Sequence, residues 1–487
     1  MVEIDFKDAL TGVLSKFPMV ERPSWHVHFK SKMMWTIAIL ILFFALGNVP
    51  LFGLSPESLD LFGRWRAIFA GERFSLTALG IMPIVDASIV LQLLVGAGII
   101  NLNLSDPRDQ AFYQNLQKLL VLAFAALISS TYVVGFYVPS QDIANLLGVE
   151  LGTIRLLLFI QIFIGGMLIY FMDEVVSKWG VGSGVSLFIL AGVSQQVITG
   201  LVNWVPDETG WAVGVIPRWV EIAQQLSVYE ILEGGITFLF QHHLIALFST
   251  IAVFFIVVYL ESTRLEIPLA HSMARGARGR FPIKILYASV LPMILVRALQ
   301  ASVQGFGRLF YSRGITIFGT YEGNSAVSGL MYYLDPIYSP WDWFPTLVHA
   351  AYPNVASWQI VLRLGIDLAF MVIGGAIFAL FWINTTGMGS KDVASQIYRS
   401  GLQIPGHRRN PANIERMMEG YIPKIAIMGG AILGVLAVIA NMFGTLGQAS
   451  GTGLLLAVSI AYNLYEEVAS EQMMEMYPMM RHFFGGE

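Results

Sequence analysis

Two charged residues interrupt apolar runs that are long enough to cross a membrane. Asp86 stands in the run Leu79–Gly96, which also contains Pro83, and Arg297 stands in the run at 285–306. Hydrocarbon tolerates neither a lone charge nor a helix breaker cheaply, because it offers no water to polar groups. The run around Asp86 is therefore expected where protein or water, rather than lipid, surrounds part of the helix. This pattern points to a pore or a gate.

The sequence lacks several residue patterns that are typical of hydrolytic, redox or nucleotide-dependent chemistry. The chain has no cysteine, which excludes a disulfide, a thiolate nucleophile and a cysteine-ligated metal. The motifs Gly-x-Ser-x-Gly, His-Glu-x-x-His and Gly-x-x-x-x-Gly-Lys-Ser/Thr are absent from the sequence. The adjacent His242 and His243 would face different ways on a helix, so we expect an interfacial role rather than a metal site. We expect no enzyme activity, no cofactor and no metal.

The composition is that of a polytopic membrane protein. Of the 487 residues, 55% are hydrophobic and only 13% are charged, whereas soluble domains contain about 25% charged residues. The net charge of −4 is too small to argue for nucleic-acid binding. No cleavable signal peptide is expected, since the first apolar run begins only at Met33, after a stretch of mixed charge.

Apolar runs predict about ten membrane-spanning helices, each near the length that a bilayer requires. They lie at 33–54, 76–100, 119–138, 156–172, 183–204, 244–260, 285–306, 360–383, 425–443 and 454–465. Five runs precede the segment 205–243 and five follow it. An odd number of spans in each half gives the halves opposite topology, as in inverted repeats. The expected fold class is therefore an all-α polytopic membrane protein with two inverted five-helix halves.

Lysine and arginine indicate the orientation in the membrane. With the N-terminus inside, the inside segments contain about 19 of these residues and the outside segments about 7, which favours a cytoplasmic location for both termini. The expected units are an N-terminal amphipathic cytoplasmic segment at 1–32, a first half at 33–204, an external connection at 205–243, a second half at 244–465 and a cytoplasmic tail at 466–487. The second half includes two basic cytoplasmic loops, at 261–284 and 387–424.

Two further connections are expected on the outside. Residues 59–70 are weakly hydrophobic but too short and too charged to span a bilayer. They form either an external loop helix or a half-helix that enters a polar cavity, where irregular backbone survives at depth. Residues 309–357 are rich in Tyr, Trp, Pro and Gly and are expected to form an external loop.

Several short motifs occur in order along nearly the whole chain. They are 80–85 (GIMPIV) with 92–96 (QLLVG), 173–184 (DEVVSKWGVGSG), 267–271 (IPLAH), 281–284 (FPIK), 385–387 (TTG) and 451–453 (GTG). Together with the ten spans, these motifs resemble the SecY family, the central subunits of the protein-conducting translocation channel. The archaeal and eukaryotic branch of that family is the more similar one.

The resemblance implies an hourglass pore between two five-helix halves, with a ring of aliphatic side chains at its waist. Matched motif by motif, the ring residues would be Ile81, Val85, Val185, Ile189, Ile294 and Leu456. The spacing agrees for two pairs, because residues four apart share one face of a helix. Branched aliphatic side chains dewet a narrow constriction and so block ions without a charged gate. Aliphatic pairs at this spacing are also common in any membrane helix.

The resemblance also assigns residues 59–70 to a plug that sits under the ring in the closed state. Its residues would be Leu61, Phe62, Gly63, Arg64, Trp65, Arg66, Ala67, Ile68 and Phe69. The two arginines make this version unusually charged, which suits a water-filled outer funnel.

The two basic loops resemble loops that dock the ribosome, because phosphate-rich RNA attracts basic side chains. The candidates are Arg275, Arg278, Arg280, Arg408 and Arg409; simple enforcement of topology is an equal alternative for each. The implied partners are the ribosome, signal peptides and nascent chains, membrane lipid, and small SecE/gamma-type and beta-type subunits in a heterotrimer. The implied location is the plasma membrane.

Two departures from the family pattern concern its lateral gate. The family usually has a neutral polar residue at the position of Asp86 and a small or apolar one at the position of Arg297. We assign Asp86, Arg297 and Ser302 to the gate and expect Asp86 and Arg297 to form an ion pair across it; separate exposure to cavity water is the alternative. A second pair, Arg363 with Asp367, is expected at i,i+4 spacing and receives no function.

The implied function is a passive channel for secretory and membrane proteins, with energy supplied by a partner. A secondary transporter is the alternative class, since inverted repeats and broken helices are typical of transporters. Transporters group ionisable residues at mid-membrane, and here we expect only Asp86 and Arg297 to lie deep.

Overall fold

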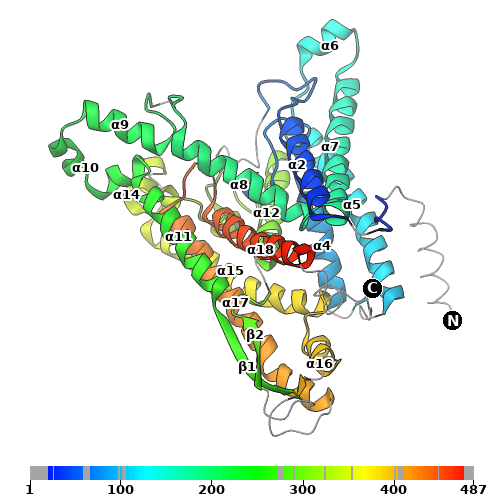
Figure 1. The fold of residues 1–487 in the computed structure, drawn as a ribbon. Coiled ribbons are helices and arrows are strands. Elements are labelled where there is room, and N and C mark those ends of the chain that lie inside the picture. Colours follow the sequence, from blue (N-terminus) through cyan, green and yellow to red (C-terminus); the bar gives the residue numbers. More distant parts are fainter. Residues whose placement is uncertain are drawn as a thin grey trace.

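Long helices make up most of the structure, a computed structural model (Figure 1). The described residues are 20–25, 27–58, 66–96, 99–100, 102, 106–207, 209–271, 278–288, 291–322, 325–352, 355–399, 402–403, 411–447 and 449–476.

Each predicted span corresponds to a helix. In chain order these helices are α2 (Phe29–Gly47), α4 (Met82–Gly96), α5 (Pro107–Gly135), α7 (Leu151–Trp179), α8 (Gly184–Val202), α11 (Leu244–Ser262), α12 (Leu291–Ser312), α15 (Ser357–Thr385), α17 (Pro411–Phe443) and α18 (Gly451–Met476).

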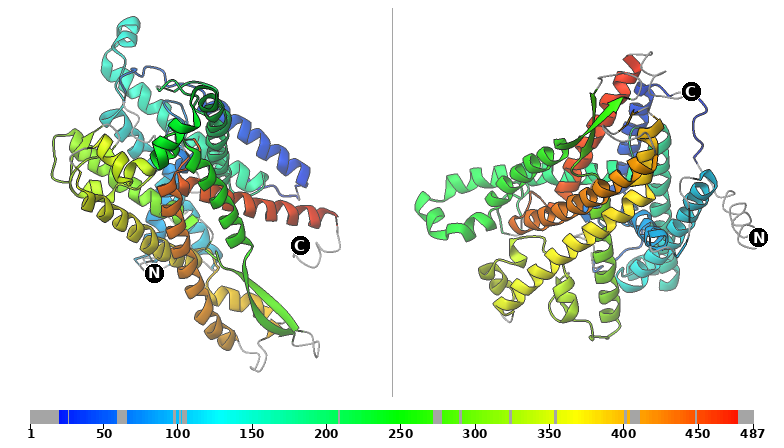
Figure 2. Two further views of the ribbon diagram at one scale, coloured as in Figure 1. Left: turned by 90° about the vertical axis from the view of Figure 1, so that its left-hand side faces the viewer. Right: turned by 90° about the horizontal axis from the view of Figure 1, so that it is seen from below.

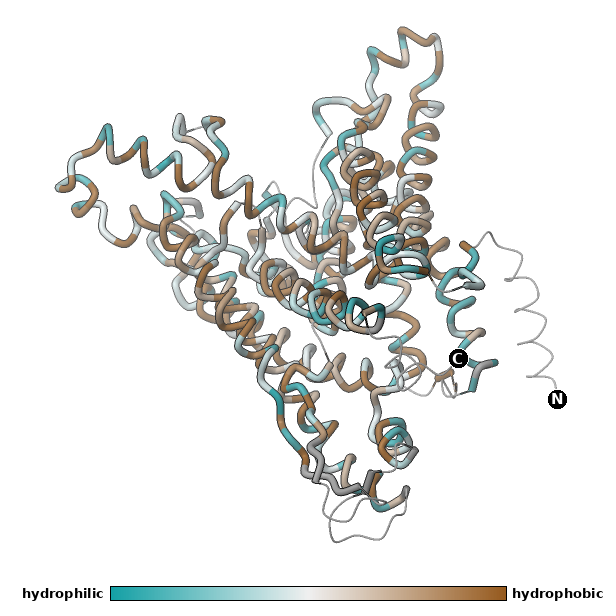
Figure 3. The backbone as a smooth tube through the Cα atoms, in the orientation of Figure 1, coloured by the Kyte–Doolittle hydropathy of each residue, from teal (hydrophilic) through white to brown (hydrophobic). Residues whose placement is uncertain are grey.

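Length and composition alone qualify seven helices of the described part of the chain as membrane spans. Helix α4 is apolar but shorter, while α12 and α18 contain more polar residues. Figure 3 shows the hydropathy of each residue along the chain, and hydrophobic residues dominate α2 and α11. Helices α4, α12 and α18 do not meet these criteria, and we expect them to face protein or water rather than lipid over part of their length.

The helices pack as two sets that follow the order of the chain. In the first set α5 contacts α4 and α7, and in the second α15 contacts α12 and α17. Helices α15 (yellow) and α17 (orange) run side by side in Figure 2. The sets meet where α8 contacts α18 and where α4 contacts α12 and α15. One hydrophobic core draws buried residues from both sets. Its centre is the place where α4, α8, α12 and α18 converge.

The connection between the two sets forms a small helical unit of its own. After a β-bridge between Pro206 and Ala212, helices α9 (Val215–Gln225) and α10 (Val228–Gln241) follow and lead back into α11. They extend at the upper left of Figure 1. Gly235, at φ 55°, bends α10 in its middle, a backbone conformation that glycine adopts without strain.

A three-stranded sheet lies at the other end of α11, formed by strands from the two segments expected as basic loops, 261–284 and 387–424. Strands β1 (Arg264–His271) and β2 (Arg278–Lys284) form an antiparallel hairpin, and β5 (Leu402–Gln403) pairs with β1. The order is therefore β2-β1-β5. Helix α16 (Ser390–Arg399) lies next to this sheet at the bottom of Figure 1.

Two further connections contain short elements. Helix α6 (Gln141–Leu147) joins α5 to α7. The connection expected at 309–357 contains short elements that pack in a small hydrophobic cluster, together with Ile360 of α15. Its elements are β3 (Tyr321–Glu322), β4 (Ser325–Ala326), α13 (Gly329–Leu334), the 3-10 helix η1 (Pro340–Asp342) and α14 (Pro345–Ala351).

Candidate functional site

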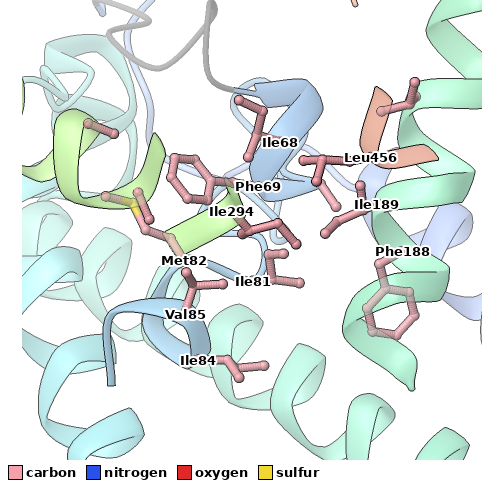
Figure 4. Close-up of a cluster of buried hydrophobic side chains, with 14 of the residues drawn as sticks. Ile68, Phe69, Ile81, Met82, Ile84, Val85, Phe188, Ile189, Ile294 and Leu456 are labelled. Carbon is pink, nitrogen blue, oxygen red and sulfur yellow. The ribbon is translucent and has the colours of Figure 1, made fainter. Parts of the chain in front are cut away.

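Aliphatic side chains from four helices converge at the centre of the core. We call Ile81, Val85, Ile189, Ile294 and Leu456 the constriction cluster; each is buried, with at most 4% of its surface exposed. Figure 4 shows Ile81, Ile189, Ile294 and Leu456 pointing toward one another. Of the six predicted ring residues, the structure thus brings five into one buried cluster. The sixth, Val185, is half-buried and packs against the same core.

Local contacts explain how α8 places its two aliphatic side chains. The backbone N–H of Val185 donates to Asp173 Oδ1 at 2.9 Å, which satisfies a donor at the start of α8. A Cβ at Gly184 would overlap the backbone of Asp173. This turn sets where α8 begins, and Ile189 then follows Val185 by one helical turn.

The constriction cluster lies between cavities whose walls include polar side chains. Along α8, Ser183 and Ser186 line a cavity of about 420 Å³ that precedes Ile189, while Gln195 and Thr199 line one of about 620 Å³ that follows it. Along α18 the order is reversed. Ser450, before Leu456, lines a third cavity of about 430 Å³ that shares Arg66, His243 and Gly447 with the second, and Asn463, after Leu456, lines the first. Because the two helices run in opposite senses, both place the aliphatic cluster between the cavities. The arrangement is an hourglass with a dry waist.

A short helix covers one side of this waist. Helix α3 (Arg66–Phe69) buries Ile68 and Phe69 next to the constriction cluster, as Figure 4 shows. The carbonyl oxygen of Phe69 accepts a hydrogen bond of 2.8 Å from the N–H of Ile81. Gly80 permits this approach, because a Cβ there would overlap the Phe69 carbonyl. The backbone of α3 is therefore joined directly to the start of α4.

Only part of the predicted plug belongs to the described residues. Its members Leu61, Phe62, Gly63, Arg64 and Trp65 lie outside them, while Arg66, Ala67, Ile68 and Phe69 form α3. Arg66 faces the outer cavities together with Glu72. Burial lowers the pKa of Arg66 and raises the pKa of Glu72, and the attraction between the two charges opposes both shifts. The charged end of α3 thus meets a polar space, while its apolar end meets the waist.

An apolar cavity separates α4 and α5 from α12 at the side of the cluster. It has a volume of about 360 Å³, and hydrophobic side chains from all three helices form most of its wall. Asp86 and Ser302 face each other there, and Ser302 Oγ donates to Asp86 Oδ1 over 3.4 Å. The contact between the two helix sets is therefore weak at this point, since a hydrogen bond of that length is near the geometric limit.

The expected ion pair between Asp86 and Arg297 is wrong. Among the described residues, Arg297 pairs with Asp367 instead, with Nη1 and Oδ1 3.0 Å apart and both side chains fully buried. The cost of burying a charge correctly indicated that Arg297 needs a partner. It could not indicate which carboxylate the fold brings near, and Asp367 stands on α15, packed beside α12.

The expected pair between Arg363 and Asp367 is also wrong, because the fold brings another carboxylate, that of Asp335, next to Arg363. Arg363 Nη2 lies 2.9 Å from Asp335 Oδ2, in the segment that follows α13. Asp86 and Arg297 are therefore not the only deep ionisable residues, because Asp367, Glu261 and Arg363 are also buried in spanning helices. Asp367 neutralises Arg297 and accepts from the backbone N–H of Ile337.

Strands from the two basic loops pair with each other in the structure. Arg278 and Arg280 belong to β2, whereas Arg275, Arg408 and Arg409 lie outside the described residues. Because β5 pairs with β1, the two loops share one sheet. Glu466 of α18 anchors this sheet through Arg264 at 2.8 Å and Lys284 at 2.6 Å. Sequence motifs had indicated the loops but not this pairing.

A buried charge in the connection between the helix sets was missed by sequence analysis. Arg218 of α9 is 4% exposed and pairs with Asp207 at 2.6 Å. Burial, reinforced by Arg218, lowers the pKa of the neighbouring His243 to about 4. The outer cavity of about 620 Å³ includes all three side chains in its wall. The adjacent histidines were the available signal, but only the fold reveals the arginine beside them.

Two family models match adjoining parts of the chain. Residues 75–465 match the model described as SecY, and residues 41–73 match the plug domain of Sec61p. The second match includes all of α3 and ends shortly before Gly80.

Known proteins match over nearly the full length. The protein translocase subunit SecY of Archaeoglobus fulgidus is 54% identical, over 98% of this chain and 99% of the relative. A solved structure described as a protein conducting channel is 36% identical with a TM-score of 0.78, over 96% of this chain and 98% of the other. Sec61 in the canine ribosome-channel complex from the endoplasmic reticulum is 34% identical with a TM-score of 0.74, with the same coverage.

Proposed function

The chain belongs to the SecY family, and we propose that it is the pore-forming subunit of a protein translocase. In this function it passes unfolded secretory polypeptides across the membrane and releases transmembrane segments sideways into lipid. The observation that supports this best is the constriction cluster, an aliphatic waist between cavities that polar side chains help to line, with α3 packed against it. A dry waist of this kind excludes ions while an unfolded chain can push the side chains apart.

The seal has two parts in this proposal. Ile81, Val85, Val185, Ile189, Ile294 and Leu456 form a ring around the translocation path, and the segment at 59–70 is the plug beneath it. Burial of Ile68 and Phe69 against the ring residues supports the plug assignment. An arriving polypeptide displaces α3 into the outer cavity, where water solvates Arg66.

The lateral gate lies between α4 and α12 in this proposal. The apolar cavity at Asp86 and Ser302 supports this location, because a hydrophobic segment would replace few polar contacts there. Burial of apolar surface, at roughly 25 cal/mol per Å², supplies the driving force for a transmembrane segment to enter. Hydrophilic segments have little apolar surface to bury, so they remain in the pore.

Partners supply the energy and complete the complex. We propose that a translating ribosome docks on the sheet β2-β1-β5 through Arg278, Arg280 and the neighbouring Arg275, Arg408 and Arg409. Small SecE/gamma-type and beta-type membrane subunits complete a heterotrimer that receives signal peptides and nascent chains. The complex resides in the plasma membrane with both termini of this chain in the cytoplasm, which the lysine and arginine bias supports.

Ion conductance in planar bilayers tests the pore. The full chain, purified with the subunits that accompany it, is compared with a variant that lacks residues 59–70. We expect the intact complex to be nearly silent and the deletion variant to conduct ions. A deletion variant that is folded but equally silent, and that fails to translocate a secretory substrate into proteoliposomes, would contradict the proposal. Uptake of a solute driven by an ion gradient would then favour a transporter.

A further inference from the structure

We propose that Arg297 is a positioning residue that holds two helices of the ring, α12 and α18, at a fixed spacing. Its Nε donates to Thr452 Oγ1 on α18 at 3.2 Å. Its Nη1 donates to Asp367 Oδ1 on α15 at 3.0 Å and to Gln300 Oε1 on α12 at 2.7 Å. One fully buried guanidinium thus connects three helices. The planar fork of arginine suits this, because its donors point in fixed directions.

The partners of Arg297 are themselves fixed by further hydrogen bonds. Asp367 accepts from Gln300 Nε2 at 3.1 Å and from the backbone N–H of Ile337 at 3.3 Å. Thr452 is held by Asn441 of α17, whose Nδ2 donates to Thr452 Oγ1 at 3.3 Å and whose Oδ1 accepts from the Thr452 backbone at 3.2 Å. A shift of Thr452 would therefore disturb α17, and a shift of Asp367 would disturb the segment at Ile337.

The position of this network relates it to the waist of the channel. Arg297 follows Ile294 by three residues on α12, and Thr452 precedes Leu456 by four residues on α18. Both separations are about one helical turn. The bond between Arg297 and Thr452 therefore lies one turn from both aliphatic side chains, and it sets how closely Ile294 and Leu456 approach.

The two sides of α12 differ in strength. Toward α15 and α18 it is held by a buried ion pair with several hydrogen bonds, and breaking such a pair strands an uncompensated charge. Toward α4 it faces an apolar cavity and the long hydrogen bond from Ser302 to Asp86. When the channel opens, α12 therefore moves together with α15 and α18, and Ile294 stays beside Leu456 while Ile81 and Val85 move away.

This inference rests on the proposed function, because it concerns the resting seal of the channel. The test compares the resting ion leak of reconstituted full-length complexes. T452V removes the hydroxyl that bonds Arg297 but retains side-chain shape and leaves the Arg297–Asp367 pair in place. S459A is the matched control, since Ser459 is a buried hydroxyl on the same helix that donates to Glu261 of α11 and not to α12.

T452V removes the acceptor of both Arg297 Nε and Asn441 Nδ2. We expect it to raise the resting leak at least three- to tenfold, which is roughly the population shift that loss of one buried hydrogen bond produces, with an unfolding temperature no lower than that of S459A. S459A should leave the leak unchanged. R297K keeps the charge but has no planar fork, so it should leak like T452V. A folded T452V with the wild-type leak, or an equal leak in S459A, would overturn the inference. The deletion of 59–70 is measured in parallel, and a folded deletion variant that is silent and also fails to translocate a secretory substrate would show that the proposed pore itself has failed.

Discussion

Gly80 lies where the backbone of α3, in the proposed plug, approaches the start of α4. Its φ of 53° lies in the left-handed region, which costs other residues about 1–2 kcal/mol. A Cβ would also overlap the Phe69 carbonyl that accepts from Ile81. The glycine is therefore required by the close approach of α3 to α4, rather than by helix flexibility.

We expect G80A to loosen α3 and raise the resting ion leak. A penalty of about 1–2 kcal/mol corresponds to a roughly five- to thirtyfold larger fraction of channels with α3 displaced. Single-channel recording of the reconstituted complex measures this fraction directly. G365A is the control, because a Cβ at this helical glycine would meet open space. If G80A and G365A leak equally, Gly80 has no special role in the seal.

The lowered pKa of His243 predicts that the connection between the helix sets, which contains α9 and α10, becomes less stable in acid. Its pKa is about 4 in the fold, against 6.5 when unperturbed, because of burial and the nearby Arg218 and His242, with Asp207 opposing them. Between these two values the unfolded segment binds a proton that the folded one does not. Stability is therefore intact above about pH 6.5 and falls as the pH decreases toward 4, by at most about 3 kcal/mol.

Hydrogen exchange of α9 and α10 amides, referenced to α17 amides at each pH, measures this loss. We expect local opening of α9 and α10 to increase through the window from pH 6.5 to 4. H243N should flatten the profile, because asparagine tolerates the left-handed backbone at φ 61° and does not titrate. Identical profiles for the two proteins would assign the acid response to another group.

At the scale of elements, the sequence contains local information about helices but little about their partners. The i,i+4 spacing of Val185 and Ile189 sufficed to place both on one face of α8. The need of Arg297 for a countercharge was equally evident. Its choice of Asp367 was not, because 70 residues separate the two and only the packing of α12 on α15 brings them together. The pairing of β5 with β1 was hidden for the same reason.

Glu466 joins the sheet to α18 and gives an element-scale prediction. Its pairs with Arg264 and Lys284 are partly exposed, so together they contribute on the order of 1 kcal/mol. We expect E466Q to speed hydrogen exchange in β1 and β2 about two- to fivefold and to leave ion conductance unchanged. E471Q, which breaks the pair with Lys32 elsewhere on α18, should not affect the strands. Equal effects of both variants would indicate a change in α18 itself.

At the scale of the whole molecule, the two helix sets are joined unequally around the waist. Helices α8 and α18 meet in close contact, whereas α4 and α12 are separated over part of their length by the apolar cavity at Asp86 and Ser302. We expect the opening to occur where an apolar cavity already interrupts the packing between the sets. The sets should therefore part between α4 and α12 while the contact of α8 with α18 acts as the hinge side.

The absence of native cysteine allows this opening to be blocked at one chosen place. In D86C/S302C, a short bifunctional methanethiosulfonate reagent should bridge α4 to α12 across the cavity, since the native side chains already approach within 3.4 Å. S88C/Q117C is the control pair. Gln117 donates to Ser88 at 3.0 Å, so that bridge joins α4 to α5 within one helix set. We expect the first bridge to abolish insertion of a test membrane protein into proteoliposomes, reversibly on reduction, and the second to leave insertion intact. Insertion that survives the first bridge would mean that transmembrane segments leave by another route, because the bridge keeps α4 and α12 together.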